Sequence, residues 1–320
     1  MKTSPRTLLA TVIMVVTTLL VVVTSEAFAS QGFNSLFIGH SFFNPFAVGM
    51  PFHAAQAGVV GHTQSTVFAG GANGAPQALW EDLAKRAEIQ AILDVGDVEL
   101  FGMSFHGDFP TSEGYENWID YALAQNPNTS FALALPWGTN PGSTSAATYA
   151  SDWLLGHSTG WHDLIDALRA LYPGVEIYCI PYGQSALELR LLFAAGNLDD
   201  VDFLVSATGD AIYADTFGHA DDILKDLGRL VWLNAIYDVD LTTYAYDPGY
   251  IADLKGIAQS IMDGHDAAYG EPLPVPAMSP WVAAFLATVL LAVGAWSIHH
   301  GAQKLLPSLT RAGLGMRRRH

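Results

Sequence analysis

The stretch that decides the fold is FNSLFIGHSF, residues 33–42. Its first part, residues 33–38, has the length of a β-strand and lacks the regular polar–apolar alternation of a strand with one wet face. A strand of this kind is buried on both sides, as in a parallel sheet covered by helices. The residues that follow it, Gly39, His40 and Ser41, are therefore expected at the carboxyl end of a strand.

Apolar runs of similar length recur along the chain, and we expect strands at residues 63–69, 98–103, 130–135 and 175–180, with a last strand at 202–206. Segments of helix length separate them, at residues 45–57, 75–93, 113–125, 146–172, 184–195, 221–237 and 250–269. Strands that alternate with helices predict a three-layer α/β/α fold around a mostly parallel sheet. In such folds the functional site lies at the carboxyl ends of the strands.

The N-terminal residues 1–29 have the three parts of a secretory signal peptide. Lys2 and Arg6 supply the positive charge, and a long apolar stretch follows them. The small residues of Ala27-Phe-Ala29 then predict cleavage before Ser30. An uncleaved N-terminal anchor is the alternative.

The C-terminal end predicts attachment to a membrane. Residues 272–280 form a Pro-rich spacer, residues 281–298 contain no charged side chain, and residues 299–320 are basic. An uncharged helix of this length spans about 27 Å, enough to cross a bilayer core. The basic tail predicts a cytoplasmic C-terminus and a main domain outside the membrane. The order of segments resembles the sorting signals of the PEP-CTERM kind, so the helix is either a retained anchor or a substrate of a sorting enzyme.

The segment between these ends, residues 30–271, has the size of one α/β domain and is strongly acidic. It carries seven Lys and Arg against thirty Asp and Glu, a formal charge of −23, whereas the whole chain has −17. Such a field repels nucleic acid and anionic lipid. Cys179 is the only cysteine, which excludes an intramolecular disulfide and a cysteine-based metal site. Phosphate-binding and basic nucleic-acid signatures are absent from the sequence, so we expect no cofactor and no nucleic-acid partner.

Two separate motifs carry the chemistry of a nucleophilic serine. Ser41 follows the first strand, where the N–H groups of the next helix can stabilise negative charge, although a serine that only caps a helix fits the same pattern. In the second half, Asp215 precedes His219 by four residues. A histidine with a nearby carboxylate provides a general base and its orienting partner. Asp210 is the alternative acid.

With these motifs the chain resembles the SGNH (GDSL-type) hydrolases, over residues 33–237. Gly39-His40-Ser41 is similar to their first block, with His40 in the place of the usual aspartate. Asp215 and His219 are similar to their last block, with one additional residue between them, and a Leu-Gly pair follows on the next helix. The resemblance implies a flavodoxin-like fold and ester hydrolysis by Ser41, His219 and Asp215.

The resemblance also implies an oxyanion hole made by the serine N–H, a glycine after the second strand and an asparagine after the third. Gly71 is the preferred glycine, and Gly70 is nearly as suitable. Ser104 stands where the asparagine is expected, so either its hydroxyl or the His106 side chain is the remaining donor. A His106 that caps a helix or fills the cleft rim is the other interpretation.

Two alternative hypotheses remain open at this point. The segment Gly156-His-Ser158-Thr-Gly160 fits the nucleophile elbow of the α/β-hydrolases, but the elbow needs a strand before its serine, and residues 146–155 have the pattern of a helix. A non-catalytic extracellular binding protein on the same scaffold is the second hypothesis. His157 and His162 have no third ligand at a recognisable spacing, so we expect no metal site there.

The sequence therefore predicts an exported serine hydrolase that acts on ester bonds. The resemblance implies a broad range of substrates, from small acyl esters and lipid esters to acetylated carbohydrates. An extracytoplasmic location favours a polysaccharide carrying O-acetyl groups.

Overall fold

The central sheet has five parallel strands in the order β2-β1-β3-β4-β5. The strands are β1 (Asn34–Gly39), β2 (Thr63–Phe68), β3 (Leu100–Ser104), β4 (Ser130–Ala134) and β5 (Ile177–Ile180). The order is that of a flavodoxin-like fold, in which the chain reverses direction across the sheet beside β1. This confirms the expected three-layer α/β architecture in the computed structural model, which describes residues 30–270.

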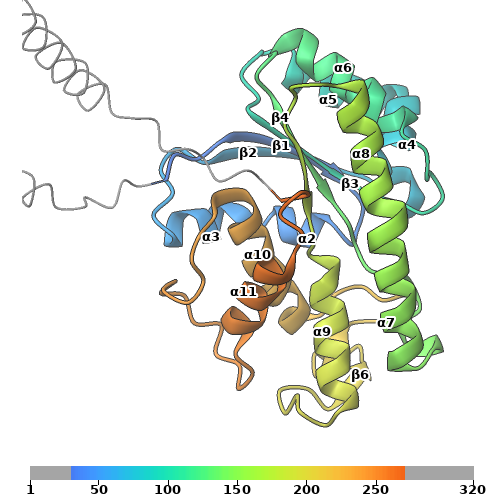
Figure 1. The fold of residues 1–320 in the computed structure, drawn as a ribbon, viewed down its shortest axis with the longest axis vertical. Coiled ribbons are helices and arrows are strands. Elements are labelled where there is room, and N and C mark those ends of the chain that lie inside the picture. The colour runs from blue at the N-terminus through green and yellow to red at the C-terminus, as the bar shows by residue number, and fades with distance from the viewer. Residues whose placement is uncertain (1–29, 271–320) are drawn as a thin grey trace, which may run out of the picture. The chain divides into compact units, whose positions relative to one another are not determined.

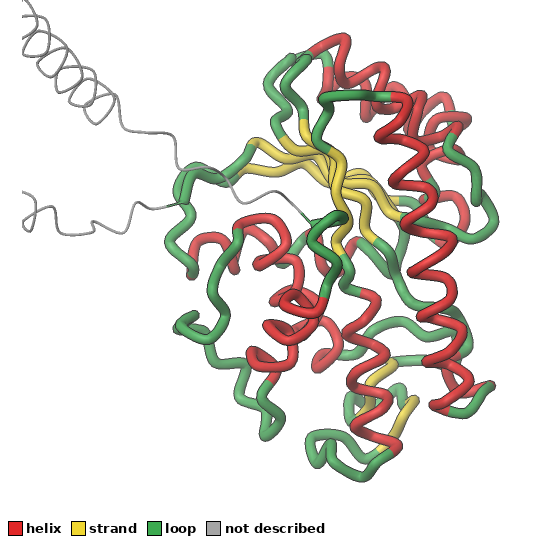
Figure 2. Tube along the Cα trace, in the orientation of Figure 1, coloured by secondary structure: helices red, strands yellow, loops and turns green. Residues whose placement is uncertain are grey.

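Helices cover both faces of the sheet (Figure 1; Figure 2). One layer contains α2 (Asn44–Ala47), α3 (Met50–Gln56), α9 (Gly183–Ala194), α10 (Asp222–Tyr237) and α11 (Leu254–Gly264). The other layer contains α4 (Pro76–Glu81), α5 (Leu83–Leu93), α6 (Glu113–Gln125) and α8 (His162–Leu171). Helix α7 (Ala146–Leu155) leads into α8 through a wider helical turn, η3 (Gly156–Trp161). A short 3-10 helix, η1 (Gly71–Gly74), follows β2, and another, η2 (Pro141–Ser143), follows β4.

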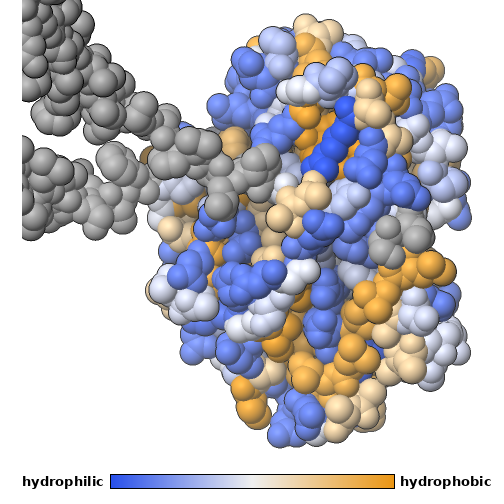
Figure 3. All heavy atoms as spheres, in the orientation of Figure 1, coloured by the Kyte–Doolittle hydropathy of each residue, from blue (hydrophilic) through white to orange (hydrophobic). Residues whose placement is uncertain are grey.

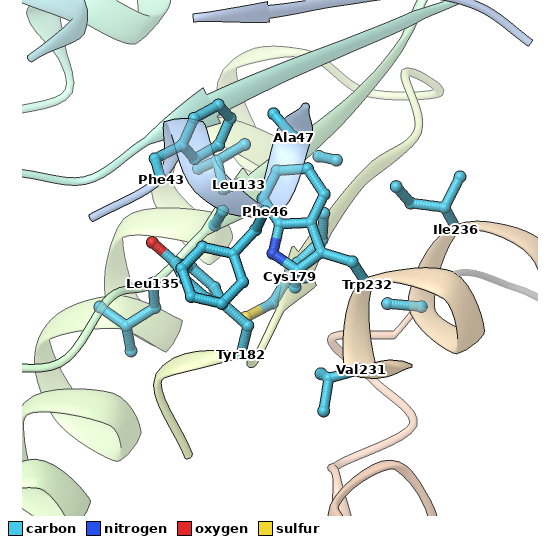
Figure 4. Packing of buried hydrophobic residues seen from close by; sticks show 14 of the residues in the cluster. Phe43, Phe46, Ala47, Leu133, Leu135, Cys179, Tyr182, Val231, Trp232 and Ile236 are labelled. Atoms are coloured by element: carbon cyan, nitrogen blue, oxygen red, sulfur yellow. The ribbon is translucent and has the colours of Figure 1, made fainter. Parts of the chain in front are cut away.

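Aromatic side chains fill the space between the sheet and α10. Trp232 of α10 is fully buried, and its ring centroid lies 5.0 Å from that of Phe43 and 5.3 Å from that of Phe37. Figure 4 shows Trp232 beside Phe46 and Tyr182 in this cluster. Helix α10 approaches closely because residue 228 is a glycine: a Cβ there would lie 2.2 Å from the Phe46 ring. The Leu-Gly pair of the sequence motif thus has a packing role.

The expected last strand at residues 202–206 does not join the central sheet, and this part of the prediction is wrong. Residues 203–205 form β6 (Phe203–Val205), which pairs with β7 (Ala211–Tyr213) in a separate two-stranded sheet. The free edge of β5 is taken by a later segment, because the Cys179 N–H donates to the Tyr269 carbonyl at 2.7 Å. A sixth strand would need that same edge.

Two expected helices are interrupted. Residues 45–57 form α2 and α3, and residues 75–93 form α4 and α5. The second break is at Asp82, whose carboxylate accepts the N–H groups of Ala84 and Lys85 and so begins a new helix.

The surface is mixed in hydropathy. On the face drawn in Figure 3, hydrophilic residues prevail and apolar residues gather over α7 and α9. Leu154 and Leu155 of α7 and Leu191 of α9 are among the exposed large apolar residues. Within residues 30–270, no helix is both long and apolar enough to cross a membrane. The expected signal peptide (1–29) and the expected spacer, hydrophobic helix and tail (272–320) lie outside the described residues.

Candidate active site

Ser41 lies in the turn that joins the carboxyl end of β1 to α2. The His40 carbonyl accepts the N–H groups of Phe43 and Asn44 at 3.0 and 2.9 Å, which closes the turn around Ser41. The Ser41 side chain is partly exposed. Its hydroxyl therefore stands at the end of a central strand, where the α/β topology places functional groups.

His219 lies on the loop between β7 and α10, and Asp215 shapes this loop. One carboxylate oxygen of Asp215 accepts the N–H groups of Gly218 and His219 at 2.9 and 3.1 Å. Gly218 has a φ of +108°, which only glycine adopts without strain. These two hydrogen bonds and the glycine conformation together orient the His219 ring toward the Asp215 side chain.

The three side chains form one hydrogen-bonded series. The other Asp215 oxygen, Oδ2, lies 2.6 Å from His219 Nδ1, and His219 Nε2 lies 2.9 Å from Ser41 Oγ. With the Nδ1 proton donated to the carboxylate, Nε2 is left as the acceptor of the Ser41 hydroxyl proton. The acid beside His219 is Asp215; the alternative, Asp210, contributes only its backbone carbonyl, to Asp202 and Phe203.

The Asp215 carboxylate is held in its ionised form. Desolvation, the largest single influence, raises the pKa of Asp215. The hydrogen bonds from the His219 ring and from the two N–H groups together lower it by more, so the net pKa lies below its ordinary value. An ionised carboxylate can stabilise an imidazolium at His219.

The loop between β4 and α7 holds the His219 loop in place. The Trp137 indole N–H donates to the Gly218 carbonyl at 2.8 Å, and the Asn140 N–H donates to the Phe217 carbonyl at 2.9 Å. A Cβ at Gly218 would lie 2.8 Å from Pro141, so the two loops are in close contact. No sequence motif marked Trp137, although its position just after a strand end is a signal that could have found it.

Ser41 opens into a cavity of about 340 Å³, which we call the Ser41 cavity. Its walls come from the carboxyl ends of β1, β3 and β4, from the start of η1 and from the β7–α10 loop. They include Phe42, Gly71, Phe105, His106, Leu135, Pro136, Trp137, Gly138 and Phe217. Phe217 is 46% exposed and lies beside His219, with 5.5 Å between the ring centroids. The Ser41 hydroxyl is thus bordered mainly by apolar atoms.

Two backbone N–H groups are available as oxyanion donors. Gly71, rather than Gly70, lines the Ser41 cavity. Helix η1 sits tightly against the end of β1, since a Cβ at Gly74 would lie 2.6 Å from the Gly39 carbonyl oxygen. Among the described residues, no acceptor pairs with the backbone N–H of Ser41 or of Gly71. These groups can therefore donate to a bound oxygen atom.

The structure does not place Ser104 at this cavity, which corrects one of the two expected side-chain donors. Ser104 is fully buried, and its Oγ lies 2.9 Å from His40 Nε2. His40 also accepts the Phe42 N–H at Nδ1 (3.2 Å), so its proton is on Nε2 and is donated to the Phe105 carbonyl (2.8 Å). Burial is the main cause that lowers the pKa of His40 to about 4, which keeps this ring neutral.

His40 therefore has a structural position that the sequence comparison did not anticipate. Its two ring nitrogens connect the Ser41 turn to the segment after β3. An aspartate at this position could accept the Phe42 N–H but could not donate to Phe105. His40 and Ser104, the two residues that depart from the motif pattern of the resemblance, contact each other.

His106 is the side chain that the structure leaves facing the Ser41 cavity. The Asp108 N–H donates to His106 Nδ1 at 3.2 Å. A neutral His106 ring then carries its proton on Nε2, which makes that atom a hydrogen-bond donor. The expectation that His106 takes the place of the missing amide is compatible with this arrangement.

The elbow hypothesis for Ser158 does not fit the backbone. Residues 146–155 form helix α7, and Ser158 lies in the helical turn η3, whereas an elbow needs a strand directly before the serine. The Ser158 side chain lies outside the description. In the part of the chain that the structure describes, no group of three or more His, Cys, Asp or Glu side chains is arranged to hold a metal ion.

Comparisons with known proteins do not assign this chain to a family. No family model and no curated protein matches the sequence. A solved DUF4886 family protein from Bacteroides uniformis is similar at 16% identity and a TM-score of 0.47, over 73% of this chain and 96% of the other. The periplasmic domain of a lipopolysaccharide acetyltransferase from Salmonella ser. Paratyphi A has 12% identity and a TM-score of 0.37, over 64% and 83% of the two chains. These similarities are too slight to carry an argument about function.

Proposed function

We propose that this protein is a serine hydrolase that cleaves ester bonds. The observation that carries the proposal is the series Asp215–His219–Ser41, with 2.6 and 2.9 Å between its hydrogen-bonding atoms. These contacts bring together two loops that are 178 residues apart in the sequence. Such a series activates a hydroxyl that is otherwise a weak nucleophile.

The reaction would proceed through an acyl-enzyme. Ser41 Oγ attacks the ester carbonyl carbon while His219 Nε2 takes the hydroxyl proton, and Asp215 stabilises the imidazolium that forms. His219 then gives the proton to the leaving alcohol oxygen as the carbon–oxygen bond breaks. A water molecule, deprotonated by the same nitrogen, attacks the acyl-enzyme and releases the acid and free Ser41.

Negative charge on the carbonyl oxygen would be stabilised by three donors. We assign them to the N–H groups of Ser41 and Gly71 and to the Nε2–H of His106. Both N–H groups belong to residues that line the Ser41 cavity, as does His106. Preorganised donors of this kind are worth about 2.7–4 kcal/mol each in the transition state.

The proposal extends to where the enzyme works. The terminal segments of the sequence favour export and attachment to or sorting at a membrane, with the domain outside the cell membrane. An ester substrate there is a small acyl ester or an acylated polysaccharide. Fractionation of cells that produce the full-length protein would test the location, and recovery of the uncleaved chain in the cytosol would contradict it.

Hydrolysis of p-nitrophenyl acetate by the purified full-length protein tests the activity. Ser41→Ala should lower kcat/KM by at least about a thousandfold, because the nucleophile is removed. Ser260→Ala, a change on α11 far along the chain from the proposed site, is the matched control and should retain the activity. Unchanged turnover in Ser41→Ala would refute the assignment. Loss of turnover in Ser158→Ala alone would support the elbow hypothesis instead.

A non-catalytic binding protein is the second candidate. The observation in its favour is that Ser104 is turned toward His40 and that none of the described residues lining the Ser41 cavity is an Asn or a Gln. A fluorophosphonate probe separates the candidates, since it labels a serine only when the serine is activated. Labelling that is absent in the parent protein, together with inertness toward a panel of acyl esters, would favour the binding protein.

A further inference from the structure

A second cavity, which we call the side cavity, adjoins the Ser41 cavity. It has a volume of about 310 Å³. The two cavities share four lining residues, Phe105, Leu135, Pro136 and Gly138. Trp153 of α7 and Trp161 at the end of η3 line the part beyond them. A molecule bound at Ser41 would therefore reach the side cavity by extending past these shared residues.

The walls of the side cavity present mainly carbon atoms. The Trp161 indole N–H points away from the cavity, because it donates to Cys179 Sγ in the core at 2.9 Å. The Trp153 indole nitrogen and His157 Nε2 are buried and have no described partner, so neither is accessible to a ligand. Burial lowers the pKa of His157 to about 3, which keeps its ring neutral. The Asp152 side chain is the exposed acid of this lining.

The position of His219 decides which part of an ester faces this cavity. The leaving alcohol lies beside His219 Nε2, since that nitrogen returns the proton to it. His219 is on the β7–α10 loop, and the described residues of that loop do not line the side cavity. The side cavity instead opens between the ends of β3 and β4, at Phe105 and Leu135. The acyl part of the ester is thus the part directed toward it.

We propose that the side cavity binds the hydrocarbon chain of the acyl group, and that the substrates are esters of medium-chain acids. The inference rests on the proposed function, because it takes Ser41 and His219 as the reacting groups. A cavity of about 150 Å³ holds a benzene molecule, so one of about 310 Å³ has room for a chain on the order of eight carbons. Each buried methylene group should raise kcat/KM about fourfold until the cavity is full.

The test is the chain-length profile of the full-length protein. kcat/KM is measured for p-nitrophenyl acetate, butyrate, hexanoate, octanoate and dodecanoate. We expect a rise to hexanoate or octanoate and a fall at dodecanoate. A profile that is highest at acetate and falls with each added carbon would overturn the inference while leaving ester hydrolysis in place.

Two glycines allow the cavity to be filled without disturbing the backbone. A Cβ at Gly138 or at Gly160 would meet no other atom within 4 Å, and neither residue has a positive φ. Gly138→Val narrows the junction and should lower the octanoate-to-acetate ratio by at least about tenfold. Gly160→Leu fills the far end and should shift the optimum to a shorter chain. Gly264→Val, at the end of α11 and also free of contacts, is the matched control and should keep the parent profile.

Binding of octanamide, an uncharged probe, keeps the inference separate from the proposed function. Calorimetry should detect binding of octanamide to Ser41→Ala. The affinity should be lower by at least about tenfold in the double variant Ser41→Ala/Gly138→Val. If the parent protein hydrolyses no ester but this binding pattern is found, the proposed function fails and the side cavity still binds acyl chains. If octanamide does not bind, or if Gly138→Val leaves both binding and the chain-length profile unchanged, the inference is wrong.

Discussion

Asp215→Asn should abolish the proposed ester hydrolysis by reversing the tautomer of His219. In the parent, one oxygen of Asp215 is fixed by the N–H groups of Gly218 and His219, and the other accepts the proton on Nδ1. In the variant, the amide oxygen is the group that can accept those two N–H groups. The amide NH₂ then faces Nδ1 and donates to it. Nδ1 becomes an acceptor, the proton moves to Nε2, and Nε2 can no longer take the proton of Ser41.

The expected loss follows from that change of tautomer. A comparable aspartate-to-asparagine change in a serine protease lowers kcat by about 10⁴-fold, which corresponds to about 5.4 kcal/mol of transition-state stabilisation. The Asp215 side chain is 47% exposed, so long-range charge is screened and contributes little to this loss. KM should hardly change, because Asp215 touches His219 rather than the cavity.

Steady-state kinetics with p-nitrophenyl esters and nitrogen NMR of the histidine rings provide the measurement. The parent should show the proton of His219 on Nδ1, and Asp215→Asn should show it on Nε2. Asp210→Asn is the matched control and should leave both the rate and the NMR signals of His219 as they are. A loss smaller than about tenfold in Asp215→Asn, or a large loss in Asp210→Asn, would refute the reasoning.

Three further predictions follow from the same geometry. His106→Ala should lower kcat by about 10²-fold and Ser104→Ala by only a few-fold, because His106 faces the Ser41 cavity and Ser104 does not; the reverse order in the same ester assay would restore Ser104 as the donor. The pKa of His40 is lowered to about 4 in the folded protein, against 6.5 when unfolded. Between these two pH values the unfolded chain binds more protons than the folded one. The free energy of unfolding should therefore fall as the pH drops from about 6.5 to about 4. Urea unfolding at several pH values should show a weaker dependence in His40→Gln, and an unchanged dependence would contradict this. Gly228→Ala should lower the free energy of unfolding by about 1–3 kcal/mol, because the added methyl group overpacks against Phe46. Gly264→Ala is the control, and equal melting temperatures for the two variants would contradict the close approach of α10.

Much of the fold follows from local sequence patterns. The runs that form β1, β3, β4 and β5 are almost wholly buried, so their apolar character is visible without any knowledge of neighbours, whereas the edge strand β2 is largely polar and partly exposed. Helix α6 begins and ends at the expected residues, Glu113 and Gln125. The exception is the run at 202–206, whose apolar character predicts a strand but not its partner. That partner depends on Tyr269, which reaches the edge of β5 from the end of the domain.

The candidate site was predictable only in part, for a related reason. Ser41 and His219 stand in recognisable motifs, and a motif fixes which residues can react. It does not fix the direction of a side chain such as Ser104, which is decided by its contact with His40, 64 residues away. The side cavity is even harder to predict from the sequence, because α7, η3 and the ends of two strands each contribute part of its wall. No single stretch of sequence contains it.

The hydrogen bond between Cys179 and Tyr269 also covers a strand edge that could otherwise pair with another chain. An open strand edge offers unpaired N–H and C=O groups to any other chain that can extend beside it, and this is a common route to aggregation. Here the residues after α11 close that edge, and the Arg169 side chain fastens them by donating to the Ile177 and Ala268 carbonyls. A chain cut before Tyr269 would keep Ser41, His219 and Asp215 and lose this cover. A shortened protein should therefore keep the edge of β5 covered only if it retains the residues up to Tyr269.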